Sequence, residues 1–368
     1  MARKGENIYL RRDGRWEGRY IKGRRANGHP HFGSVYGASY GEVKRKLLPL
    51  KTAYNTQAMQ ARCTAPLGDY LLMRLGTQRN SRIKASSYDS YFRIVHNHLL
   101  PLLGDVPMHK LNEQHVQQCL HRLQDKGLSA GTVRNIFRYL SGTVRVAVKN
   151  GAMSRDVCAE VAPPKAKKPS VHALSRAQQQ ALDKMAREKQ SIEVLLALHT
   201  GMRVGEISAL RWTDIDLDNR LLTVNHTMQR LNLHKHGTKT QVQLGEPKSD
   251  SSQRNIPISA QLACMLAKHR QVSPGEFVVQ SRSKAFAEPR VVQYRFARLL
   301  ELADLPKVGF HALRHSFATR CMELNVDVAT ISKLLGHSSV KLTLDIYTDS
   351  LLEQQYAAVN KLDGLAAA

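Results

Sequence analysis

The chain has 368 residues, a hydrophobic content of 42% and a formal net charge of +25 at pH 7. This length suffices for two or three domains, and the apolar content suffices for packed cores. So large a positive charge predicts a polyanionic partner, and nucleic acid is the first candidate. No apolar run approaches the roughly 18 residues of a membrane span, and the N-terminus lacks the apolar stretch of a signal peptide. We therefore expect a cytoplasmic protein without a membrane partner.

The cysteines indicate a reducing compartment. They are odd in number and far apart, and none forms a C-x-x-C pair: Cys63, Cys119, Cys158, Cys264 and Cys321. This pattern argues against a disulfide framework and against a zinc site.

Residues 1–60 carry thirteen basic and four acidic residues, a net charge of +9. The Asp13-Gly14 pair predicts a hairpin turn, and a third strand is expected over residues 31–36. A helix should follow from residue 39 to about 60, with Pro49 kinking or interrupting it. We predict a small three-stranded sheet plus one helix, whose basic face enters a DNA major groove. The candidate DNA contacts are Arg11, Arg12, Arg15, Arg19 and Lys22. The alternative is a small basic α/β domain that binds nothing specific.

Residues 64–160 show four apolar stripes at helical spacing, which predict a four-helix domain. Asn112 and Ser129 are suitable N-caps for two of the helices. The candidate DNA contacts here are Arg82, Lys84, Arg134 and Arg138; the alternative is that they are ordinary solvated charges. Residues 162–170 are rich in proline and lysine and predict a linker between domains.

From residue 171 onward, we expect a mainly α-helical domain with a small antiparallel sheet over residues 215–217, 221–226 and 255–258. Ser175 and Gln178 form a capping box. In the segment G-M-R-V-G-E, Arg203 begins a helix and Glu206 is placed to hold its guanidinium; the alternative is a plain structural ion pair. Lys248 is expected at a hairpin tip ahead of the third strand, or as a solvated loop lysine.

The acidic cluster Asp214, Asp216 and Asp218 lies in a predicted strand and turn, with no histidine-rich segment beside it. We interpret it as structural and expect no metal or other cofactor.

Residues 310–347 contain the strongest candidate for phosphate chemistry. His311 and Arg314 are three apart and share a helix face, which we expect to be open. Apolar side chains fall on a different face: Phe310, Leu313, Phe317 and Cys321. Gly336 is a natural stop for a second helix, His337 follows it directly, and Tyr347 comes after a short apolar run.

The H-x-x-R segment, the G-H-S-S segment and the downstream tyrosine, together with G-M-R-V-G-E, resemble the tyrosine recombinase (phage integrase) family. The resemblance covers residues 64–350 well. Residues 1–60 resemble more loosely the arm-type DNA-binding domains of conjugative-transposon integrases. The resemblance as a whole implies a multidomain α+β fold. Its parts are an arm-type domain over residues 1–60, a core-binding domain over 64–160, a linker over 162–170 and a catalytic domain over 171–368.

By this resemblance, Tyr347 attacks DNA to form a 3′-phosphotyrosyl link and a free 5′-hydroxyl, without metal or ATP. Arg203 and Arg314 hold the phosphate, and His337 hydrogen-bonds it. Lys248 protonates the leaving oxygen, and His311 handles the tyrosine proton.

The resemblance implies a site-specific recombinase of a bacterial mobile element, acting on double-stranded attachment sites as a homo-tetramer. An excisionase or a host DNA-bending protein is a further expected partner. The alternatives are a type IB topoisomerase and a non-enzymatic DNA-binding repressor or architectural protein. An apolar stripe near the C-terminus predicts a helix that packs on its own domain or on a neighbouring copy: Leu352, Tyr356, Val359 and Leu362.

Overall fold

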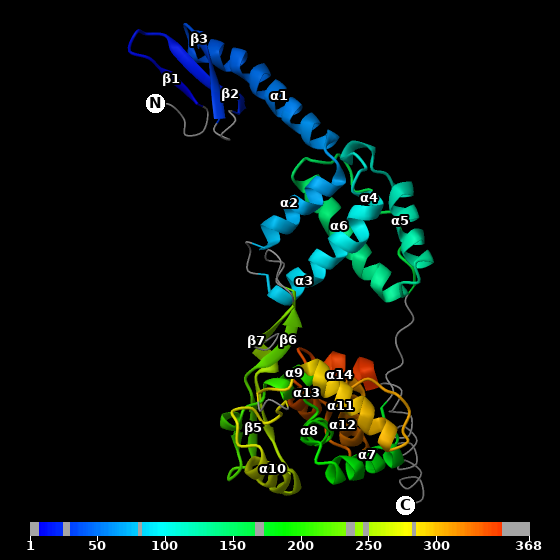
Figure 1. Cartoon of the computed structure of the whole chain (residues 1–368). Helices are drawn as coiled ribbons and strands as arrows, with labels where there is room; N and C mark the ends of the chain where they lie inside the picture. The colour runs from blue at the N-terminus through cyan, green and yellow to red at the C-terminus, as the bar shows by residue number, and fades with distance from the viewer. Residues whose placement is uncertain are drawn as a thin grey trace, which may run out of the picture. The chain divides into compact units, whose positions relative to one another are not determined.

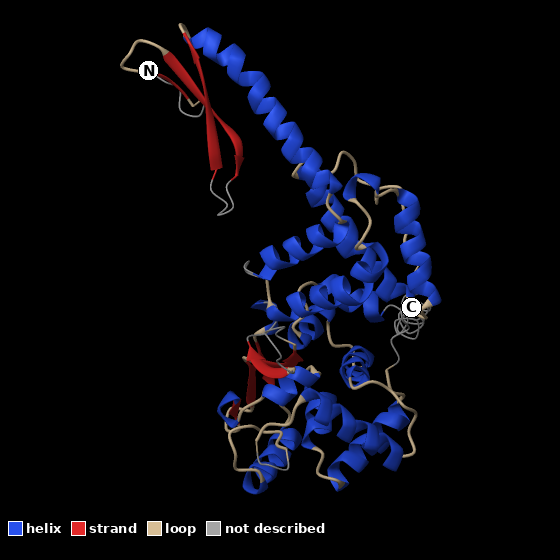
Figure 2. Ribbon diagram, turned by 45° about the horizontal axis from the view of Figure 1, so that its top comes forward, coloured by secondary structure: helices blue, strands red, loops and turns tan. Residues whose placement is uncertain are grey.

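The computed structural model describes residues 7–24, 30–79, 83–165, 173–232, 240–245, 250–281 and 285–347. They fall into two compact units, residues 1–167 and 168–368 (Figure 1). Helices predominate, and every sheet is small and antiparallel (Figure 2). The predicted multidomain α+β fold is confirmed. Among the described helices, none is long and apolar enough to cross a bilayer.

The N-terminal sheet has three strands, β1 (Ile8–Leu10), β2 (Trp16–Arg24) and β3 (Pro30–Gly37), in the order β1-β2-β3. Gly14 takes a φ of 80° in the turn between β1 and β2, as the Asp13-Gly14 pair predicts. Helix α1 (Tyr40–Thr64) packs against the sheet. At Gly18 of β2, a Cβ atom would lie 2.6 Å from Val43 Cγ1, so glycine allows this close approach.

Helix α1 continues through Pro49 as one element, so an interruption at the proline is wrong, and a kink there stays a prediction. The helix is anchored by Val43 and Leu47, which are buried against the sheet directly before the proline. This burial offsets the hydrogen bond that a proline removes from a helix interior.

Four helical stretches follow. They are α2 (Leu67–Arg79); α3 (Ala85–Ile94), which continues through a π-helical segment (Val95–Leu99) into α4 (Leu100–Leu103); α5 (Glu113–Asp125); and α6 (Ala130–Lys149). The Asn112 and Ser129 side chains accept hydrogen bonds from the backbone N–H groups of His115 and Thr132. Both predicted N-caps are therefore present. The apolar stripes of these helices meet in one core.

The second unit contains eight α-helices within its described residues. They are α7 (Arg176–Glu188), α8 (Ile192–Thr200), α9 (Val204–Ala209), α10 (Ala260–Val272), α11 (Pro289–Leu302), α12 (His311–Glu323), α13 (Val328–Leu335) and α14 (Val340–Tyr347). The capping box of Ser175 and Gln178 starts α7 as predicted. Residues 348–368, which include the C-terminal apolar stripe, lie outside the described part of the chain.

The sheets of this unit differ in part from the prediction. Strands β4 (Ile215–Asp216), β5 (Leu221–Val224) and β8 (Arg254–Pro257) form the expected three-stranded sheet. Strands β6 (Thr227–Leu231) and β7 (Gln241–Gly245) form an additional hairpin. The sequence did not indicate this hairpin, because polar residues such as Gln229, Arg230 and Gln243 obscure its alternation. Lys248, expected at a hairpin tip ahead of the third strand, lies outside the described residues.

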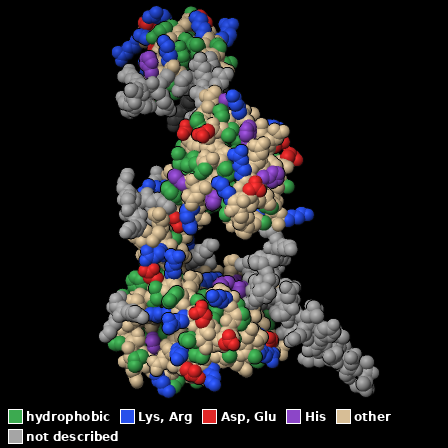
Figure 3. Space-filling model, turned by 45° about the vertical axis from the view of Figure 1, so that its right-hand side comes forward, with side chains coloured by type: hydrophobic (Ala, Val, Ile, Leu, Met, Phe, Trp, Pro, Cys, Tyr) green, Lys and Arg blue, Asp and Glu red, His purple; other side chains and the backbone are tan. Residues whose placement is uncertain are grey.

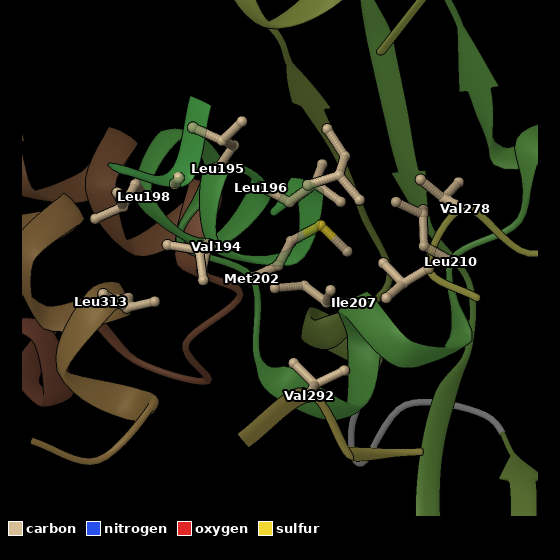
Figure 4. Packing of buried hydrophobic residues seen from close by; sticks show 14 of the residues in the cluster. Val194, Leu195, Leu196, Leu198, Met202, Ile207, Leu210, Val278, Val292 and Leu313 are labelled. Atoms are coloured by element: carbon tan, nitrogen blue, oxygen red, sulfur yellow. The ribbon is translucent and has the colours of Figure 1, made fainter. Parts of the chain in front are cut away.

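Helix α8 is the centre of the second core, with eight of its nine residues buried. Figure 4 shows its Val194, Leu195, Leu196 and Leu198 in one cluster with Leu313 of α12. Met202 and Ile207 belong to the same cluster and are 1% and 0% exposed. Because these two residues bracket Arg203 in the chain, the core fixes the backbone from which Arg203 projects.

We predict that Gly201→Ala destabilises the second unit by about 2–4 kcal/mol. Gly201 has a φ of 65°, and a Cβ there would lie 2.6 Å from the Phe317 ring and 2.8 Å from Leu335 Cδ2. The estimate combines left-handed strain of about 1 kcal/mol with overpacking of about 1–3 kcal/mol. The measurement is the thermal midpoint of this unit in the full chain. Gly309→Ala is the control, because a Cβ at Gly309 meets nothing within 4 Å. Equal midpoints for the two variants would contradict the prediction.

Candidate active site

Arg203 is the N-cap residue of α9 and is held by Glu206. Its backbone N–H donates to Glu206 Oε2 at 2.9 Å, and its Nη1 donates to Oε1 at 2.7 Å. The Glu206 side chain is 3% exposed, whereas the Arg203 side chain is 36% exposed. One buried carboxylate therefore caps the helix and orients a guanidinium that reaches the surface.

Arg254, at the start of β8, binds the same carboxylate. Its Nη2 lies 2.9 Å from Glu206 Oε2, and its Nε donates to the Leu334 carbonyl at 2.6 Å. Burial opposes the ionisation of Glu206, but the hydrogen bonds and charge of Arg254, and then the charge of Arg203, hold the pKa of this carboxyl below its usual value. The sequence analysis did not single out Arg254, which stands at the start of the short strand R-N-I-P.

Arg314 of α12 is buried, with 2% exposure, so the open face predicted for it is wrong. Its Nη1 donates to the Gly201 carbonyl at 2.9 Å and its Nη2 to the Leu335 carbonyl at 2.6 Å. These carbonyls lie at the C-terminal ends of α8 and α13, where backbone acceptors lack intrahelical partners and the helix dipole favours a cation. Burial of this charge is therefore compensated by the ends of two helices.

His337 follows Gly336, which ends α13 with a φ of 65°. The His337 Nδ1 and the Thr343 Oγ1 are 2.8 Å apart, and Thr343 of α14 is buried. Arg203 Nη2 donates to the Gly336 carbonyl at 3.2 Å. Arg203 and Arg314, separated by more than a hundred residues, thus both bind the turn that carries His337.

His311 begins α12 and is exposed. His311 and Arg203 both line a cavity of about 500 Å³. The His311 ring packs edge to face against the His315 ring, with the two ring centroids 4.5 Å apart. Desolvation, followed by the charges of Arg314 and Arg203, lowers the pKa of His311. Desolvation and the charges of Arg314, Arg203 and Arg254 lower the pKa of His337 to about 4. Both shifts favour the neutral imidazole near pH 7 in the free protein.

The structure brings Arg203, His311, Arg314 and His337 into one site. Tyr347 ends α14, but its side chain lies outside the described residues, as do Lys248 and Arg82. Asp214 accepts hydrogen bonds from the Arg211 backbone and the Asn225 side chain, a structural arrangement. Among the described residues, no cluster of three or more His, Cys, Asp or Glu is placed to hold a metal ion. The described free thiols are Cys119, Cys158, Cys264 and Cys321.

The predicted DNA contacts of the first unit are surface residues where they are described. Arg11, Arg12, Arg15, Arg19 and Lys22 are exposed in the N-terminal sheet and its turn. Figure 3 shows Lys and Arg side chains gathered on this part of the molecule. The other candidate DNA-contact residues that the structure describes are likewise exposed: Lys84, Arg134 and Arg138.

Comparison with known proteins identifies the family of this chain. Residues 168–354 match the phage integrase family, and residues 67–124 match the N-terminal SAM-like domain of phage integrases. A XerC-like tyrosine recombinase of Caldanaerobacter subterraneus is 26% identical over 278 residues, covering 68% of this chain and 70% of that protein. The ICEBs1 integrase of Bacillus subtilis is 24% identical, covering 77% of this chain and 78% of that protein.

Solved structures show the same fold. The Tn1549 transposon integrase bound to a circular intermediate DNA gives a TM-score of 0.70 at 19% identity, over 81% of this chain and 99% of that chain. A lambda integrase dimer bound to a core site gives 0.61 at 19% identity, over 94% of this chain and 96% of that chain. The fold and the family match are those of a tyrosine recombinase, a class of site-specific DNA-recombining enzymes. The chain belongs to the phage integrase family and resembles the integrases of conjugative transposons.

We predict that the free protein loses stability as the pH falls from about 6.5 towards 4. His337 has a pKa of about 4 when folded and about 6.5 when unfolded. The unfolded state therefore binds more protons in this window, and the free energy of unfolding decreases as the pH falls. Thermal midpoints measured from pH 7 to pH 5 should fall less steeply for His337→Gln than for the wild type. Parallel curves would contradict the lowered pKa.

Proposed function

We propose that this recombinase integrates and excises a bacterial mobile element by cleaving and rejoining attachment-site DNA through a 3′-phosphotyrosyl intermediate. The observation that supports the residue roles most directly is the convergence of Arg203 and Arg314 on the Leu335 and Gly336 carbonyls, beside His337. An anchored pair of guanidinium groups beside a neutral imidazole suits a phosphodiester, since guanidinium groups bind non-bridging phosphate oxygens.

In the proposed reaction, the Tyr347 oxygen attacks the phosphorus and the bond from phosphorus to the 5′-oxygen breaks. Lys248 donates a proton to that 5′-oxygen, and His311 accepts the tyrosine proton. Arg203 and Arg314 stabilise the charge that develops on the non-bridging oxygens, and His337 hydrogen-bonds one of them. The phosphotyrosyl ester conserves the energy of the broken phosphodiester bond. The 5′-hydroxyl of another strand can therefore attack the same phosphorus, which rejoins the DNA and releases Tyr347.

Neutral histidines in the free protein fit these roles. A neutral His311 can accept a proton at physiological pH. The pKa of His337 is low partly because three arginines face it, and an incoming phosphate offsets that positive charge. DNA binding should therefore raise the pKa of His337 towards its ordinary value.

We further propose the division of labour that the resemblance implies: residues 1–60 bind arm-type DNA, 64–160 bind core sites, 162–170 act as linker and 171–368 carry catalysis. The contacts to DNA come from Arg11, Arg12, Arg15, Arg19, Lys22, Arg82, Lys84, Arg134 and Arg138. The active assembly is a homo-tetramer on DNA in the bacterial cytoplasm, with an excisionase or a host DNA-bending protein as further partner. A lambda integrase tetramer bound to a Holliday junction has a similar fold and supports this arrangement by analogy.

Arg203→Lys is predicted to reduce DNA cleavage about 100-fold or more with little change in DNA affinity. Lysine keeps the positive charge but loses the paired N–H donors with which a guanidinium binds two phosphate oxygens. Arg314→Lys should have the same effect, with a lower thermal midpoint since it also loses two carbonyl contacts. Single-turnover cleavage and equilibrium binding are measured on the same duplex. Arg176→Lys is the matched control, because Arg176 is 69% exposed and pairs with Glu323. Cleavage by Arg203→Lys at the wild-type rate would refute the phosphate-binding role.

Tyr347→Phe is predicted to retain folding and DNA binding but to form no covalent adduct. The substitution removes one oxygen, which costs about 1 kcal/mol if Tyr347 only makes a hydrogen bond. The protein is incubated with a library of labelled nicked duplexes, and adducts are resolved by denaturing electrophoresis and sequenced. Tyr356→Phe is the control and should still form the adduct. An adduct that persists in Tyr347→Phe and disappears in Tyr356→Phe would move the nucleophile to Tyr356.

A further inference from the structure

The N-terminal sheet has one face that α1 does not cover. In β2, Gly18 points at α1, and strand residues alternate in direction, so Glu17 and Arg19 point away from the helix. The register pairs Glu17 with Tyr9 of β1 and with Tyr36 of β3, which places all three on the uncovered side. We call this side the open face.

Glu17 lies at the centre of the open face and is nevertheless 4% exposed. Its Oε1 accepts hydrogen bonds from Ser34 Oγ at 2.8 Å and from Arg19 Nε at 3.1 Å. Its Oε2 accepts one from Arg11 Nη1 at 3.2 Å. The arginines that cover the carboxylate remain partly open to solvent, with 41% of the Arg11 side chain and 54% of the Arg19 side chain exposed.

Each of these two arginines is restrained a second time by an aromatic ring. The Arg11 guanidinium lies over Tyr36 and the Arg19 guanidinium over Tyr9, each 5.5 Å from the ring centroid. A contact to carboxylate together with a contact to a ring face fixes both the position and the plane of a guanidinium. Arg11 and Arg19 are therefore set in place before any ligand arrives.

A carboxylate at the centre of a basic surface repels DNA phosphates and cannot add non-specific affinity. The carboxylate can improve selectivity, because an arginine that hydrogen-bonds the edge of a guanine base must hold its guanidinium group in a defined plane. Ordering the side chain in advance also reduces the rotamer entropy lost on binding. The position of Glu17 thus suits discrimination between sequences rather than overall attraction to DNA.

We infer that Glu17 is a positioning residue that orients Arg11 and Arg19 for sequence-specific DNA binding by the open face. The inference rests on the proposed DNA-binding role of the N-terminal sheet. It gives this buried acid a part in site selection, distinct from the chemistry of the second unit.

The test uses the full chain. Wild-type protein first selects duplexes from a random-sequence library, and the selection is repeated with the Arg11→Ala, Arg19→Ala double variant. The sequence element lost in the double variant is the probe, and a scrambled duplex of equal length is the reference. The measured quantity is the ratio of the two affinities for each further variant.

Glu17→Gln keeps the side-chain volume and an acceptor for Ser34 but removes the charge that holds both arginines. We expect the affinity ratio to fall about tenfold, while affinity for the scrambled duplex stays equal or rises. Glu42→Gln is the matched control, since Glu42 belongs to the same sheet and helix unit and pairs with Lys46 on α1. It removes the same charge and should leave the ratio unchanged.

The outcomes separate the inference from the proposed function. If no sequence element is lost in the double variant, the DNA-reading role of the sheet fails and the inference fails with it. If the element exists and Glu17→Gln keeps the wild-type ratio, or raises both affinities equally, the inference alone is overturned. Should Glu17→Gln melt the sheet, Ser34→Ala replaces it, since this change removes one of the two hydrogen bonds to Glu17 Oε1 without altering charge. A reduced ratio for Ser34→Ala would support the inference, and an unchanged ratio would overturn it.

Discussion

The buried carboxylate of Glu206 is the interaction on which the candidate active site depends. It accepts hydrogen bonds from Arg203 and Arg254 while 3% exposed. A pair of guanidinium groups this close would repel without an anion between them, and a buried anion would be costly without them. Because Arg254 also binds the Leu334 carbonyl, the same network ties α9 and β8 to α13. The charge balance of the site and the packing of three elements are thus one arrangement.

Helix ends supply the second constraint. The carbonyls that receive Arg203 and Arg314 belong to Gly201, Leu335 and Gly336, at the C-termini of α8 and α13. Both helices end in a glycine with positive φ, which turns the chain sharply and leaves carbonyls directed at the site. The guanidinium positions are therefore set by where two core helices stop. Burial, followed by the resulting concentration of positive charge, lowers the pKa of His311 and of His337.

In each of the two units, a buried carboxylate holds arginine side chains in place. In the second unit, Glu206 secures the buried Arg254 together with Arg203, whose guanidinium reaches the surface. In the N-terminal sheet, Glu17 secures arginines that remain partly exposed, assisted by the Tyr9 and Tyr36 rings. In both places, a buried acid sets the direction of flexible basic side chains. The large net charge accounts for attraction to a polyanion, but the few buried acids decide where that charge points.

The sequence alone determined the features that depend on local pattern. Helical periodicity, the Asp13-Gly14 turn and the N-caps at Asn112, Ser129 and Ser175 predicted the fold class and most elements. The order of the H-x-x-R, G-H-S-S and tyrosine segments predicted the family. These signals are readable because capping, turn formation and amphipathic periodicity involve residues a few positions apart.

Only the tertiary structure decided how distant residues meet. It buried Arg314, which helical spacing had placed on an open face, because the carbonyls that compensate its charge come from helices elsewhere in the chain. It revealed Arg254 as the partner of Glu206, and it formed the β6–β7 hairpin despite weak alternation. It also placed Glu17 beneath two arginines. Burial of a charge depends on partners brought together by packing, and that information is not contained in the spacing of neighbouring residues.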